Sequence, residues 1–156
     1  LVYNFPTSVD LTGARISISN ISMYYSWDNI NINYSNNRFS YRWRDGATTN
    51  TYSVVIPDGL YEVKDLNAYL QFVFIANKHY LVNSVGQNVY YAEFVVNPNR
   101  YAVQINTYPV PLSLPSGWSN PATMVFPDQS FNPEITLTAN FKEILGYAAG
   151  FTTDLR

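Results

Sequence analysis

Alternating apolar and polar residues predict two adjacent strands in the first half of the chain. In residues 36–44 every second side chain from Phe39 onwards is aromatic, and residues 51–56 form a second strand-like segment. Asp45-Gly46 lies between the two segments, and this dipeptide is typical of a tight turn. The pattern therefore predicts a β-hairpin.

Residues 14–27 show the same alternation with one change of register. Ile16 and Ile18 share one face, whereas beyond Asn20 the apolar side chains lie at odd-numbered positions up to Trp27. Such a shift predicts a bulge, or a break between two strands.

The apolar period changes to 3.6 residues after Gly59. One helical face carries Leu66, Tyr69, Leu70, Val73 and Phe74. We expect one helix near residues 64–77, with Asp65 or the residue before it as its N-cap.

The rest of the chain predicts short strands around a long proline-rich connection. Linked antiparallel strands are predicted over residues 79–83, 89–96 and 101–108. Residues 109–133 contain six of the nine prolines, which cannot donate central ladder hydrogen bonds, so a long, stiff surface loop is expected there. A last strand is predicted over residues 134–139, then a short turn at 141–145 that Asn140 caps and Gly146 ends.

These elements predict an all-β chain. The expected fold is one domain over residues 1–156, a two-sheet antiparallel sandwich of jelly-roll type with about eight strands and one inserted helix.

Composition narrows the classes of partner. Nine Lys and Arg against eleven Asp and Glu argue against a nucleic-acid-binding surface. No cysteine is present, which excludes disulfides and thiolate metal sites. Because no apolar run approaches the roughly 20 residues of a membrane span, we expect a soluble protein. Charged residues are only 13% of the chain, and 14 residues are tyrosines. A surface with few charges and many tyrosines favours contacts with other molecules.

Candidate catalytic groups are few. His79 is the only histidine, and no nucleophile motif accompanies it. Because it follows Lys78, we expect it on the surface or in a loop. Most aspartates lie at predicted turns, and Glu93, within a strand, is expected to face solvent. We therefore predict no catalytic, cofactor or metal site; an enzyme would need two facing carboxylates.

Arginines and exposed aromatics are the candidate contact residues. Arg38, Arg42 and Arg44 share one strand face, which is either a solvated outer face or a stripe that binds phosphate, a sialic-type carboxylate or acids of a neighbouring subunit. The aromatic candidates for stacking on sugars or anchoring an interface, with core packing as the alternative, are Tyr24, Trp27, Tyr91 and Trp118. Among the aromatics, Trp118 is expected to be the most exposed.

Four segments carry a resemblance to a known group of proteins. They are ISMYYSWDNI, IPDGLYEVKDLNAYLQ, YAVQINTYPVPLSLPSGW and NFKEILGYAAGF. The chain from Ile21 to Phe151 resembles jelly-roll structural proteins of Polinton-like and adintovirus-like elements, which are related to virophage capsid components. The resemblance implies a virion protein, such as a minor capsid, penton-like or spike component, that forms a symmetric oligomer with itself and with other coat proteins.

The sequence leaves two functions open. The first is a virion structural protein that works through self-assembly and protein–protein contacts. The second is a lectin-like module that binds a glycan or a cell-surface receptor, and a spike that attaches to its host would combine both roles.

Overall fold

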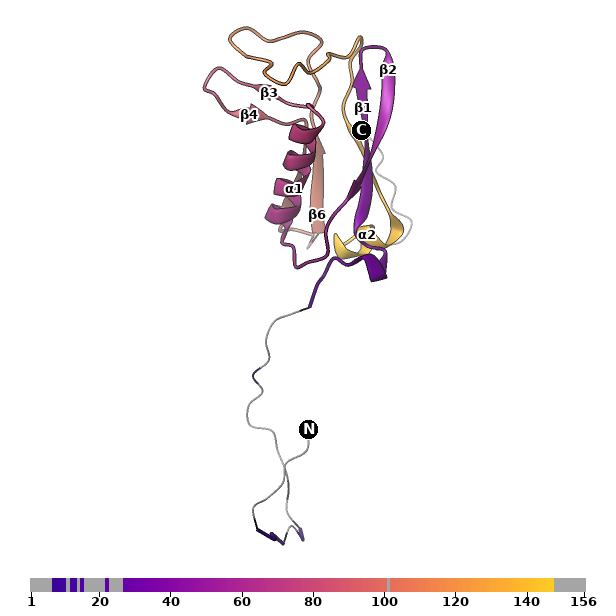
Figure 1. Cartoon of the computed structure of the whole chain (residues 1–156), viewed down its shortest axis with the longest axis vertical. Coiled ribbons are helices and arrows are strands. Elements are labelled where there is room, and N and C mark those ends of the chain that lie inside the picture. The colour runs from indigo at the N-terminus through magenta and orange to yellow at the C-terminus, as the bar shows by residue number, and fades with distance from the viewer. Residues whose placement is uncertain are drawn as a thin grey trace.

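The computed structural model describes residues 7–10, 12–13, 15, 22, 27–100 and 102–147. The elements, in chain order, are η1 (Ile32–Tyr34), β1 (Arg38–Asp45), β2 (Thr48–Val55), α1 (Val63–Ala76), β3 (Leu81–Val82), β4 (Asn88–Val89), β5 (Ala92–Asn97), β6 (Ala102–Thr107), β7 (Glu134–Leu137) and α2 (Ala139–Ile144). Most of these elements are strands in antiparallel sheets, with few helices (Figure 1). The prediction of a β-rich, antiparallel fold is confirmed.

The described strands form smaller sheets than we predicted. One sheet has the order β2-β1-β7, and two further pairs are β3-β4 and β5-β6. These are seven strands in three sheets, where the sequence predicted about eight strands in two sheets. The strands predicted over residues 14–27 lie outside the described residues, except at positions 15, 22 and 27.

The hairpin of β1 and β2 forms as predicted. Arg38 pairs with Val55 at one end and Asp45 with Thr48 at the other. Gly46 occupies the turn with φ 57°, a left-handed conformation that favours glycine. β7 pairs with the other edge of β1, so β1 is the central strand of its sheet.

Helix α1 begins earlier than its predicted cap. Its N-cap is Glu62, and the first helical residue is Val63. Asp65, the third helical residue, still contributes to the cap. Its carboxylate accepts a hydrogen bond from the Glu62 N–H at 2.9 Å. The predicted inward face is confirmed at three positions, Leu66, Leu70 and Phe74, which are buried.

Two predicted element boundaries were wrong. The single strand expected over residues 89–96 is broken at Tyr90 and Tyr91, because its first part, β4, pairs with β3 and its second part, β5, pairs with β6. Thr138, not Asn140, is the N-cap of α2. The Asn140 amide instead donates to the Tyr34 carbonyl at 2.8 Å.

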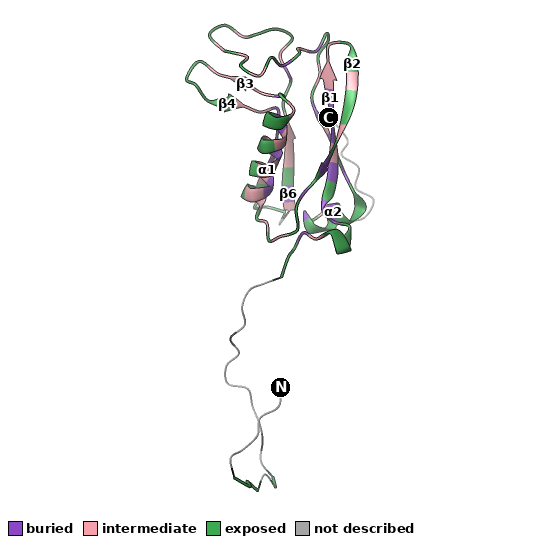
Figure 2. Ribbon diagram, in the orientation of Figure 1, coloured by how far each residue is buried: buried purple, intermediate pink, exposed green. Residues whose placement is uncertain are grey.

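The core lies between two layers. In Figure 1 the β1–β2 hairpin forms one layer, α1 and β6 form the other, and α2 lies at one end of the first. Phe39 of β1 joins them, because its ring packs 5.7 Å from Phe94 of β5 and 5.6 Å from Phe141 of α2. Figure 2 shows the buried residues concentrated along this boundary.

The proline-rich stretch has no regular strand, as predicted, but part of it packs inward. Pro127 and Pro133 are fully buried, and Met124 belongs to the core. Gly46 at the hairpin turn holds the stretch on both sides, donating to Phe126 O at 3.2 Å and accepting from Asp128 N at 3.1 Å. These bonds attach the stretch to the β1–β2 turn.

Candidate functional site

The three arginines of β1 lie on one outer face of the β2-β1-β7 sheet, as their spacing predicts. The Arg42 guanidinium binds the Glu134 carboxylate of β7 at 2.6 Å, and that of Arg44 binds Asp128 at 2.7 Å. The bond from Arg44 holds the pKa of the Asp128 carboxyl below its usual value. Two of the three charges are therefore neutralised within the chain.

Small hydroxyl side chains surround this arginine row. The register places Ser40 on the same face, flanked by Thr51 and Ser53 of β2 and by Thr136 of β7. The face is therefore polar and rich in hydrogen-bonding groups. Among the described residues, Arg38 is the member of the row for which the structure shows no ion pair.

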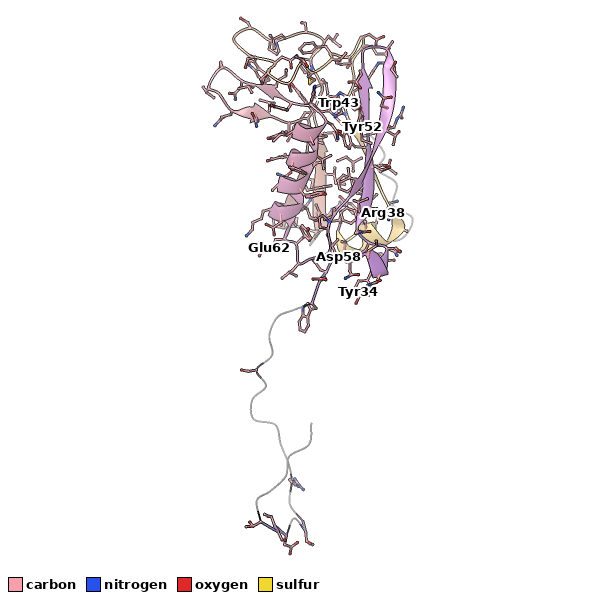
Figure 3. All side chains as sticks on the ribbon, in the orientation of Figure 1. Tyr34, Arg38, Trp43, Tyr52, Asp58 and Glu62 are labelled. Atoms are coloured by element: carbon pink, nitrogen blue, oxygen red, sulfur yellow. The ribbon has the colours of Figure 1, made fainter. Side chains whose placement is uncertain are left out.

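An open cleft of about 460 Å³ adjoins Arg38. Its lining residues are Ile32, Ser35, Asn37, Arg38, Thr138, Ala139 and Asn140. The Thr138 hydroxyl donates to the Arg38 carbonyl at 2.8 Å, which ties the start of α2 to the start of β1. Figure 3 shows Tyr34 and Arg38 at the end of the fold that carries α2.

The aromatic candidates occupy different environments. Trp27 is 55% exposed. Tyr91 is only 4% exposed, so its ring is a core group rather than a surface contact. Trp118 is half-buried against the core, less exposed than we predicted. Tyr24 lies outside the described residues.

The outer face of α1 was missed in the sequence analysis. Phe72 is 60% exposed and Ile75 is 42% exposed, and Ala68 and Ala76 are exposed on the same helix. No charged residue occurs between Leu66 and Asn77, so this part of the helix contributes no charged side chain to the surface. The missing charges were the available signal, because an ordinary amphipathic helix is polar on its solvent side.

His79 is buried, so its predicted surface position was wrong. Lys78 adopts a left-handed conformation with φ 64°, and the N–H of His79 then donates to Phe74 O at 2.8 Å. This turn at the end of α1 places the imidazole against Trp43, with ring centroids 4.2 Å apart. The His79 residue is 2% exposed, which leaves its ring without access for a substrate.

Burial favours the neutral form of His79, and the hydrogen bonds around its ring are compatible with that form. The Asn77 amide donates to the Tyr41 hydroxyl at 2.9 Å, and that hydroxyl lies 3.0 Å from His79 Nδ1. We assign the Tyr41 hydroxyl as the donor to His79 Nδ1, so Nδ1 carries no proton. The hydroxyl then accepts one hydrogen bond and donates another, and Nδ1 has its donor. Burial lowers the pKa of His79 to about 4.

Glu93 also has partners, although it was expected simply to face solvent. Its carboxylate accepts hydrogen bonds from the Asn106 amide, at 2.9 Å, and from the Tyr108 hydroxyl. These bonds lower the pKa of Glu93. The arrangement links β5 to β6 and to the residue that follows β6.

The described residues form neither a metal-binding cluster nor a membrane-spanning helix. Within the described ranges, no group of three or more His, Cys, Asp or Glu side chains is placed to hold a metal ion. Neither α1 nor α2, the two described α-helices, combines the length and the apolar character needed to cross a bilayer.

Comparisons with known proteins add no functional assignment: no family model, curated protein or solved structure matches the chain.

Proposed function

We propose that the protein is a virion structural component, acting as a capsid, penton-like or spike subunit through self-assembly and contacts with other coat proteins. A jelly-roll sandwich for the whole chain and a location in the virion belong to this proposal. The antiparallel sheets around a shared core, together with the resemblance of the four sequence segments, support it. Its role is non-catalytic.

The exposed apolar face of α1 is the observation that carries the proposal. Burying a phenylalanine side chain yields about 1.5–3 kcal/mol, so leaving Phe72 in water forgoes a large part of that stabilisation. Phe72, Ile75, Ala68 and Ala76 lie on one face with no charged side chain among them. Apolar surface of this kind marks contact sites between proteins.

Light scattering coupled to size exclusion, at several concentrations, tests the assembly. We expect a closed oligomer that grows in population with concentration, and we expect Phe72→Glu to shift it toward smaller species because a carboxylate would be desolvated in the contact. Val85→Glu is the matched control, since Val85 is 74% exposed in the turn between β3 and β4. A wild-type chain that stays monomeric at every concentration would overturn the proposal.

The cleft beside Arg38 favours the second candidate, a glycan- or receptor-binding module. Arg38 has no ion pair among the described residues and so retains its charge for an acidic sugar. A glycan array compares the wild type with Arg38→Ala, and Arg42→Ala is the control because Glu134 already neutralises Arg42. Binding that Arg38→Ala abolishes and Arg42→Ala retains supports this function, whereas equal signals in all three chains contradict it.

A further inference from the structure

Among the described residues, no strand pairs with the outer edge of β2. The N–H of Ile56 donates to Asn37 O at 2.8 Å, so these two residues form a hydrogen-bonded pair of the β1–β2 ladder. Because such pairs alternate in antiparallel sheets, Thr49, Thr51 and Ser53 direct their N–H and C=O groups away from β1.

A side-chain contact supports this alternation. Val55 belongs to the same outward set, and its carbonyl accepts the Tyr69 hydroxyl of α1 at 2.8 Å. The three preceding outward residues have no neighbouring strand among the described residues. Figure 2 shows exposed and half-buried residues along this strand.

β2 lacks the features that usually protect an edge strand. Natural edges are blocked by charges, prolines or short length, but β2 has eight residues, with neither a charge nor a proline between Thr48 and Val55. The edges of β7 and β6 differ from that of β2. β7 is shorter and carries Glu134, and the edge of β6 is covered where Val103 N donates to Leu145 O at 2.9 Å.

We propose that two copies of the chain pair through their β2 edges, antiparallel, with Thr51 opposite Thr51 of the second copy. In this register Thr49 faces Ser53 of the other copy, so all three outward residues of each strand find a partner. Each facing pair exchanges two main-chain hydrogen bonds. The result is a continuous sheet in the order β7-β1-β2-β2-β1-β7.

The strand is complementary to itself. Pairing about Thr51 brings hydroxyl side chains opposite one another and no like charges, and cross-strand threonine and serine pairs are favourable. The arginine rows of β1 stay one strand away from the twofold axis, where Glu134 and Asp128 neutralise Arg42 and Arg44. This interface rests on the proposed self-assembly, since its partner is a second copy of the chain.

Disulfide cross-linking tests the register, because the natural chain has no cysteine. Facing residues of a hydrogen-bonded pair have Cα atoms about 5.5 Å apart, within reach of a disulfide. We expect Thr51→Cys to form a covalent dimer under mild oxidation. Thr136→Cys, at an exposed site on the outer face of β7, is the control that should stay uncross-linked.

A mixing experiment tests the register further. In the proposed pairing, Thr49→Cys and Ser53→Cys cross-link with each other when the two variants are mixed. Each variant alone does not, because two copies of the same residue lie about 14 Å apart along the strand. Cross-linking of either variant alone at the same rate as the mixture would contradict this register.

The substitution Thr51→Pro tests the edge contact without removing a hydrogen bond of the β1–β2 ladder. The N–H of Thr51 does not bond to β1, so Thr51→Pro removes a hydrogen bond only from the interface. We expect Thr51→Pro to lower the fraction of chains paired through β2 at least tenfold, while the tryptophan fluorescence, to which buried Trp43 contributes, stays native. Thr51→Val preserves shape and backbone and should dimerise as the wild type does.

The outcomes distinguish the interface from the wider function. If the wild type is oligomeric but Thr51→Cys fails to cross-link and Thr51→Pro still assembles, the β2 interface is wrong while the assembly function stands. If the wild type is monomeric at every concentration, both fail.

Discussion

The His79 imidazole stacks on the Trp43 indole, with ring planes 11° from parallel. Tyr52 meets the same imidazole edge-on at 4.8 Å, and Tyr41 lies at 5.8 Å in a similar orientation. The end of α1 is therefore held in an aromatic cage built by the β1–β2 hairpin. Protonating His79 would place a positive charge in this cage. The negative charge of Asp45 partly offsets the cost of burying that charge.

The first prediction concerns acid stability. His79 has a pKa of about 4 in the folded chain, below its value of 6.5 when unfolded. The unfolded chain binds the proton first, so stability is complete above pH 6.5 and falls as the pH drops toward 4. At about 1.4 kcal/mol per pKa unit, the loss is about 3 kcal/mol.

Urea unfolding at pH 7 and pH 4.5 measures most of this loss. His79→Gln cannot titrate, so its free energy of unfolding should change less between the two pH values. Equal changes in the wild type and the variant would show that other groups dominate acid sensitivity.

The second prediction concerns the hydroxyl that binds His79. Tyr41→Phe leaves His79 Nδ1 and the Asn77 amide without a shared partner, and a buried unsatisfied group costs about 1–3 kcal/mol. The free energy of unfolding in urea should fall by that amount. The same change at exposed Tyr108 should cost clearly less, and an equal cost at both sites would contradict the importance of the buried hydroxyl.

The third prediction contrasts two phenylalanines. Phe39 packs between Phe94 and Phe141 in the core, so Phe39→Ala should lower the free energy of unfolding by about 3–5 kcal/mol. Phe72→Ala, on the exposed face of α1, should change the stability of the monomer by about 0.5 kcal/mol or less. Thermal unfolding at low concentration measures both, and similar losses would place Phe72 in the core.

The fourth prediction concerns the ion pair between β1 and the proline-rich stretch. Asp128→Asn removes the carboxylate that Arg44 binds, so the variant should be less stable than the wild type at pH 7. Because the pKa of Asp128 is lowered in the folded chain, this difference should shrink as the pH falls and the carboxyl becomes protonated. Urea unfolding across pH measures it, and a constant difference would exclude the carboxylate charge as its cause.

The sequence predicted local elements well because each one depends on neighbours in the chain. The β1–β2 hairpin follows from alternation and its Asp45-Gly46 turn, and the inward face of α1 follows from the 3.6-residue period. The outward face of the three arginines follows in the same way, because side chains alternate along any strand.

Only the tertiary structure decided which distant residues meet. Glu134 reaches Arg42 because β7 pairs with β1, and Asp128 reaches Arg44 because the proline-rich stretch bonds to the hairpin turn. His79 is buried by packing of α1 against the hairpin, which no local pattern records. The free edge of β2 likewise exists because the only strand that pairs with β2 among the described residues is β1. Composition and periodicity describe each segment alone, whereas these sites arise from pairing between segments far apart in the chain.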